Sequence, residues 1–436
     1  MGLKDWMFRS KENTFEELSF GRYSDLYKNE QKKVSWDKAL QSSEQGDYMS
    51  VYRHFIDYIS DDEHKNVEVL SSDKDHLSFM FYQGSKKVHV KLDNDFITAE
   101  VKIVRCNQAN LEVFRSLLEE NHRLKYSKFC LDKDKYLVME FQSSHLDANP
   151  YKLYYGLKEM STIADHKDDA LTEKYKEFEA VNTEHVKSIS SYLLRAKFEY
   201  FNQEITKLTD LVNANALTSR ENLGSLAFLV NAFVYKMDYL LAPEGRMMQK
   251  LDRLIELSNT DSTLLYQNAS EIMHLLDLLQ NKKEADLKHE FYHSIHTFGV
   301  TSPIDHDFVI NFIESNLESL EWYLSKRQYI FSDAVCSFVI GKLLYDYALP
   351  FYDKSLAHLF FRVTEPLFFG SIGEKGLVKN SKIKKSEVLK CLEEIEENAR
   401  KKGVLLTLNK SKLKWDKHSF GPSFLDLMLH INPINL

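Results

Sequence analysis

The chain has 436 residues, which exceeds one ordinary domain and predicts two or three. Its 43% hydrophobic and 28% charged content is typical of a globular protein with buried cores. A net charge of −8 argues against a general nucleic-acid-binding protein. With only 14 Gly and 7 Pro, the composition favours a helix-rich chain.

Residues 1–34 are polar with scattered aromatic side chains, and we expect a leader that packs on the domain after it. From Ser35 the pattern becomes helical, and apolar residues at 48, 51, 52, 55 and 59 follow the helical period. The period then changes to two, which is typical of strands with one buried face. These strands are expected at 77–82, 88–92 and 97–103, as an antiparallel meander.

The next part of the chain alternates between helix and strand. A helix with Leu111, Phe114 and Leu117 on one side precedes two strands, which are expected at 127–131 and 136–141. Asn149 then has the position of a helix cap, with Pro150 at the first helical residue. An acidic stretch from about 165 to 183 is expected to be a linker.

This order of elements resembles the YbjN family and its structural relatives, the class I chaperones of type III secretion. The segments that carry the resemblance are LSFMFYQGSKKVHVKLDNDFITAEVKIV, KYSKFCLDKDKYLVMEF and NPYKLYYGLKEM. The resemblance covers about residues 35–170. It implies an α+β domain without catalytic residues that holds or regulates another polypeptide, often as a dimer.

Residues 184–436 are expected to form an all-helical domain, either a bundle or a short solenoid, with a small C-terminal cap. The predicted helices span 186–212, 219–241, 246–257, 262–280, 284–298, 306–324, 329–348, 352–368 and 384–402. The predicted fold class is therefore α+β: an antiparallel-sheet domain with flanking helices, followed by an all-α domain.

The segment 288–296, KHEFYHSIH, contains H-E-x-x-H, which is typical of the helix of a zinc peptidase. Such a helix places two histidines one turn apart to bind Zn²⁺, and the glutamate acts as general base. His289, His293 and His296 are the candidate metal ligands, since on a helix they lie within roughly 60° of one another.

The same helical projection places Leu287, Phe291, Ile295 and Phe298 on the opposite side. The histidines would then face away from the core. We expect no sheet in this half of the chain that could hold a peptide substrate. Solvated histidines are the favoured interpretation, and a non-proteolytic metal site and a zinc-dependent hydrolase are the alternatives.

Residues 375–417 carry 13 Lys and Arg against 6 Asp and Glu. This segment is interpreted as a solvated helix face whose partners are the glutamates between 393 and 397. The alternative is a docking surface for an acidic or anionic partner.

The four cysteines (Cys106, Cys130, Cys336 and Cys391) are far apart and form no C-x-x-C pair, which is typical of reduced, cytoplasmic thiols. The N-terminus has no secretory signal, and no run of about 18 apolar residues predicts a membrane span.

We therefore expect a cytoplasmic, non-enzymatic, protein-binding or chaperone-like regulator. No cofactor is expected, nucleic acid is an improbable partner, and a homodimer is consistent with the resemblance. The mechanism would be burial of apolar partner segments by strand addition or by docking of a helix in a groove.

Overall fold

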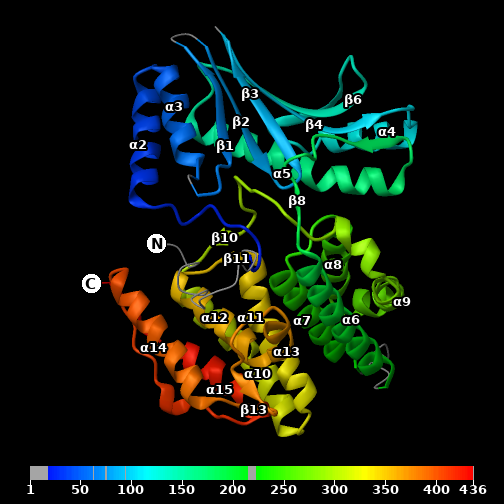
Figure 1. Cartoon of the computed structure of the whole chain (residues 1–436), viewed down its shortest axis with the longest axis vertical. Coiled ribbons are helices and arrows are strands. Elements are labelled where there is room, and N and C mark those ends of the chain that lie inside the picture. Colours follow the sequence, from blue (N-terminus) through cyan, green and yellow to red (C-terminus); the bar gives the residue numbers. More distant parts are fainter. Residues whose placement is uncertain (1–17, 62, 74–75, 94, 215–221, 436) are drawn as a thin grey trace.

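The structure is a computed structural model that describes residues 18–61, 63–73, 76–93, 95–214 and 222–435. It is a mixed α/β protein with two buried hydrophobic clusters. Figure 1 shows a sheet with its flanking helices in the upper half and a layer of packed helices in the lower half. Below, the N-terminal part means residues 30–180 and the C-terminal part means residues 191–435.

Two helices open the N-terminal part: α2 (Glu30–Glu44) and α3 (Tyr48–Ile59). The side chains of Asn29 and Asp47 cap them by accepting hydrogen bonds from backbone N–H groups in the first turns. Helix α3 buries Val51, Tyr52, Phe55 and Ile59, which confirms the helical period predicted there.

The sheet is antiparallel, and its main path has the strand order β1-β2-β3-β4-β6-β5, with β7 paired to β4. The strands are β1 (Val67–Ser72), β2 (Leu77–Gln83), β3 (Lys86–Leu92), β4 (Phe96–Cys106), β5 (Ser127–Leu131), β6 (Tyr136–Ser144) and β7 (Phe178–Ala180). The predicted meander is confirmed, with Phe79 opposite Val90 and Val90 opposite Ala99. Strand β1 was missed because nearly all of its residues are exposed and show no alternation.

Helices α4 (Leu111–Asn121) and α5 (Pro150–Lys174) complete this part. The predicted cap is confirmed, because the Asn149 side chain accepts from the N–H of Lys152 and Pro150 is the first helical residue. Figure 1 shows α5 running along one face of the sheet. Helix α5 approaches the sheet closely at Gly156, where an added Cβ would lie 2.5 Å from the Phe141 ring.

The acidic linker predicted at 165–183 is wrong at its start, because α5 continues to Lys174. Asp165 and Asp168 are buried rather than solvated. Their acidic character had indicated exposure to solvent, but they contact Ser85 and Lys86 at the start of β3. These contacts form part of the candidate site.

The C-terminal part is mainly helical, and most predicted helices are confirmed within a few residues. They are α6 (Ser191–Ala214), α7 (Leu223–Leu241), α8 (Gly245–Ser258), α9 (Ser262–Gln280), α10 (His306–Ser325), α11 (Tyr329–Asp346), α12 (Phe351–Thr364), α13 (Pro366–Ser371), α14 (Lys385–Lys401) and α15 (Lys417–Leu429). The start of the helix predicted at 219 lies outside the described residues.

The expectation of an all-helical domain is wrong in one respect, because pairs of two-residue strands join the loops of this part by hydrogen bonds. The pairs are β8 (Lys187–Ser188) with β9 (Tyr292–His293), β10 (Ser302–Pro303) with β11 (Tyr347–Ala348), β12 (Val378–Lys379) with β13 (Lys382–Ile383), and β14 (Val404–Leu405) with β15 (Ile434–Asn435). Helix α15 packs on α10, α11 and α12, so the C-terminal segment is part of the core rather than a separate cap.

The basic segment 375–417 contains helix α14, which buries Val388, Leu392 and Ile395. Its lysines pair with acidic side chains, as in Lys401–Glu397 at 2.6 Å and in the ion pair of Lys410 with Glu396 at 2.6 Å. These pairs support the interpretation of a solvated helix face. Within the residues that the structure describes, no helix has the length and apolarity that crossing a bilayer would require.

Candidate functional site

The helix predicted at 284–298 is wrong. The chain forms a short 3₁₀ turn, η1 (Glu284–His289), and then continues as extended backbone through β9. The carbonyl of Ile295 accepts a hydrogen bond from the N–H of Gly84 at 3.0 Å, and the N–H groups of Thr297 and Phe298 donate to Gln83 Oε1. The β2–β3 turn thus satisfies backbone groups that a helix would have paired internally.

The three candidate histidines therefore do not share one helix face. His289 is exposed, whereas His293 and His296 are partly buried and border a cavity. Glu290, the general base of the peptidase hypothesis, is buried and forms an ion pair with Lys282.

In the described part of the chain, ligand atoms of the three histidines do not gather within 4.8 Å of one another. The group that does is Asp61, Glu63 and His64, a mostly exposed turn. Metal binding by the three histidines stays a prediction, but without its helical support.

The segment 292–298 instead forms one wall of a cavity of about 840 Å³, here called the central cavity. Other walls come from the leader residues 18–27, from α5, from the start of α8, and from residues 349–354. The N-terminal and C-terminal parts both contribute to it. Leu287, Phe291 and Phe298 are buried and anchor the segment. Their burial was predicted from the sequence, but the helix that was expected to carry them does not form.

The described part of the leader borders this cavity and contacts both parts of the chain, whereas residues 1–17 of the expected leader lie outside the described residues. Gly21 donates its N–H to the carbonyl of Tyr239 at 2.8 Å, and its φ of +68° with Tyr239 alongside favours glycine. Asp25 contacts both parts. It accepts a hydrogen bond from Tyr154 Oη of the N-terminal part at 2.6 Å and one from the N–H of Gly299 of the C-terminal part at 2.9 Å.

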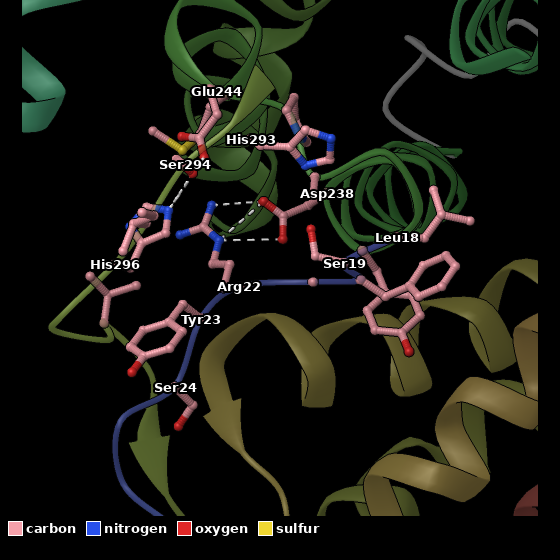
Figure 2. Close-up of a pocket in the computed structure, with 18 of the residues that line it drawn as sticks. Leu18, Ser19, Arg22, Tyr23, Ser24, Asp238, Glu244, His293, Ser294 and His296 are labelled. Carbon is pink, nitrogen blue, oxygen red and sulfur yellow. Dashed lines mark hydrogen bonds and ion pairs between the residues drawn. The ribbon is translucent and has the colours of Figure 1, made fainter. Parts of the chain in front are cut away.

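Arg22 anchors the leader to the C-terminal helices, and Figure 2 shows its side chain pointing at Asp238. Its guanidinium donates to Asp238 at 3.0 Å and to Asp252 at 2.8 Å. It also lies 3.8 Å from the centre of the Tyr345 ring. Two carboxylates and an aromatic ring surround this cation. Such a site suits the planar guanidinium of arginine, with its several N–H donors, better than the amine of lysine.

A second polar group in the cavity contains Glu244, Ser294 and His296, and Figure 2 shows these side chains converging. Ser294 Oγ lies 2.8 Å from Glu244 Oε1 and 2.7 Å from His296 Nε2. His296 Nδ1 lies 3.2 Å from Gln83 Nε2, and the Tyr23 ring stacks on the imidazole with centroids 6.0 Å apart.

The Gln83 amide fixes the tautomer of His296. Its Oε1 accepts from the N–H groups of Thr297 and Phe298, so its Nε2 must donate to His296 Nδ1. Neutral His296 then carries its proton on Nε2, facing Ser294. Ser294 in turn donates its hydroxyl proton to Glu244. This is the reverse of a serine hydrolase, in which the imidazole accepts the serine proton and a carboxylate holds the other ring nitrogen.

Burial and the neighbouring charges have opposite effects on the pKa values of His296 and Glu244. Burial lowers the pKa of His296, but the hydrogen bond and charge of Glu244 and the charge of Asp165 outweigh it and raise the pKa. Burial raises the pKa of Glu244, and the contacts with His296 and Ser294 outweigh that effect and lower it. Each partner stabilises the charge of the other.

The third group is the set of buried acids on α5. Asp165 accepts from the N–H of Ser85 at 2.7 Å and from its hydroxyl at 3.1 Å. Asp168 accepts from the same hydroxyl at 2.8 Å and forms an ion pair with Lys86, which is fully buried. Gly84 allows this approach, because its φ is +56° and an added Cβ would lie 2.0 Å from an Asp165 oxygen.

Two acids on this helix, Asp165 and Asp169, have pKa values raised toward neutral pH. Burial, followed by the charge of Glu244, raises the pKa of Asp165 to about 7. Burial and the charge of Asp168 raise the pKa of neighbouring Asp169 to about 8. The charge of Asp165 in turn raises the pKa of His296 in the 292–298 segment.

Sequence reasoning identified His293 and His296 but for a different chemistry, and it missed most of the site. Arg22 lay in a supposed leader and Asp165 in a supposed linker. A weak signal existed, since Gly84 in a turn can indicate close approach of another group. The chain matches no protein-family model and no curated protein.

Proposed function

We propose that this is a non-enzymatic binding protein that holds a ligand in the central cavity. The observation that carries the proposal is the cavity itself: about 840 Å³, bordered by the leader and by both parts of the chain. Volumes of about 300–1,000 Å³ are typical of sites for small organic ligands.

The polar groups on its walls support binding rather than catalysis. Arg22 is engaged by two aspartates, and Ser294 donates to Glu244 instead of to His296. A nucleophile or general base needs an available lone pair or proton facing the substrate. The protons and lone pairs of these side chains are used in hydrogen bonds among themselves, so the side chains position one another.

A thermal-shift screen of small molecules against the full chain tests this proposal. A true ligand stabilises the folded state by about 2.7 kcal/mol at 100 times its Kd. Met248 borders the cavity, so Met248→Trp should abolish the shift, while Leu278→Trp on the exposed face of α9 should not. A screen without hits, or hits that shift all three proteins equally, would contradict the proposal.

A second candidate function is protein binding by the N-terminal part, in keeping with the resemblance to the YbjN family and the secretion chaperones. The supporting observation is an apolar surface at the sheet edge. Strand β5 ends the strand order, Leu131 is 53% exposed, and Leu111 and Leu118 on adjacent α4 are 77% and 63% exposed. At this edge the backbone N–H and C=O of Phe129 are already bound by the Asn121 side chain, so a partner would pack on these apolar side chains rather than add a strand.

We propose a second copy of this chain as the partner at this edge, in a reduced, cytoplasmic setting that suits the four free cysteines. Sedimentation velocity should find a dimer, and Leu118→Lys combined with Leu131→Lys should give a monomer. Leu278→Lys is the matched control on an exposed helix elsewhere. A monomeric wild-type chain would refute the dimer.

A further inference from the structure

One end of the central cavity lies at the N-terminus of α12 and differs from the acidic end described above. Residues 349–352 and Lys354 border the cavity here, together with Phe20 and Lys402. The cavity's acidic lining residues, by contrast, are engaged by Ser85, Arg22 and Ser294 at the other groups. The α12 end is thus the cationic end.

No described acidic side chain pairs with the amine of Lys354, which is partly buried at the wall of the cavity. Its backbone N–H forms a helical hydrogen bond to Pro350, but no described hydrogen bond or ion pair involves its amine. Burial lowers its pKa, and no neighbouring carboxylate raises it. An anionic partner stabilises a partly buried ammonium, because desolvating the ammonium without a partner is costly.

The helix end adds to this cationic character. Helix α12 begins after Pro350, and no side chain caps it. Asp353, the acid in its first turn, is fully buried and bound to His306 at 3.0 Å. The N–H groups of the first turn therefore keep their partial positive charge, which favours an anion.

Aromatic side chains flank this end. Phe351 lies three residues before Lys354, on the same side of the helix. The Lys402 amine lies 4.3 Å from the centre of the Phe351 ring, and Phe20 of the leader borders the same cavity. A bare inorganic ion would use only a small part of 840 Å³, so the geometry favours an anion with an apolar body.

We propose that this end of the cavity is an anion subsite, in which Lys354 and the first turn of α12 bind the carboxylate or phosphate of a small organic molecule. Its apolar part lies along Phe20 and Phe351. The inference rests on the proposed function, since it names the ligand class of the same cavity.

The probe for a direct test is 8-anilinonaphthalene-1-sulfonate, an aromatic anion whose fluorescence rises on binding. Titration of the folded full chain should show saturable binding. Lys354→Gln should weaken it about tenfold or more, as expected for loss of a charge-assisted hydrogen bond. Lys354→Arg should retain most of the affinity, and Lys401→Gln, an exposed lysine paired with Glu397, should retain all of it.

Competition distinguishes the two sources of the anion: displacement by phosphate indicates a phosphorylated ligand, and displacement by benzoate a carboxylate. Circular dichroism confirms that each variant is folded. Absence of probe binding to the wild type, or equal binding by Lys354→Gln, overturns the anion subsite. If Lys354→Gln binds the probe as well as the wild type does, but Met248→Trp abolishes the probe fluorescence, the cavity remains a binding site and only the anion inference fails.

Discussion

Asp165 is buried on α5 and faces groups of the C-terminal part, so we predict that Asp165→Asn alters how stability depends on pH. The asparagine keeps the shape of the protonated acid, and its carbonyl oxygen can still accept the N–H of Ser85. It cannot ionise. The variant thus resembles the wild type as it exists at low pH.

The magnitude follows from the raised pKa. Between the unfolded pKa of about 4 and the folded pKa of about 7, the folded state holds a proton that the unfolded state has lost. This stabilisation is fully present below the unfolded pKa and is lost as pH rises through the folded pKa. The wild type should lose roughly 2–3 kcal/mol of stability relative to Asp165→Asn between pH 5 and 8.

Urea unfolding followed by far-ultraviolet circular dichroism at pH 5, 6, 7 and 8, at constant ionic strength, measures this difference. The control is Asp37→Asn, an exposed position on α2, which should leave the slope unchanged. Parallel pH profiles for the wild type and Asp165→Asn would refute the reasoning, because Asp165 would then titrate alike in both states. If the wild type instead gained stability relative to Asp165→Asn as pH rises, the pKa of Asp165 would be lowered rather than raised by folding.

Three further predictions concern the polar contacts of the site. Lys86→Met leaves the buried Asp168 without its cation and should lower the free energy of unfolding by roughly 3–5 kcal/mol, measured by urea unfolding; a loss within 0.5 kcal/mol would contradict this. Arg22→Gln should loosen the leader, so limited proteolysis with mass spectrometry should find faster cleavage near residue 22, with unchanged cleavage elsewhere. Protein purified without an affinity tag should contain no stoichiometric zinc, and zinc that disappears in His293→Ala would restore the metal hypothesis.

The sequence alone determined the regular elements whose patterns are local. Alternation in 77–103 predicted the meander, and Asn149 with Pro150 marked the start of α5, because side-chain periodicity and capping depend on neighbours in the chain. Strand β1 escaped because an exposed edge strand has no buried face to impose alternation.

Only the tertiary structure decided the site. The residues 290–298 had a helical apolar pattern, but Gln83 and Gly84 supply hydrogen bonds to their backbone and hold the segment extended. Asp165 and Arg22 belong to the site because of partners more than 79 residues away in sequence, Ser85 and Asp238. Local patterns cannot encode such pairs, since burial of a charge is stable only where folding brings its partner.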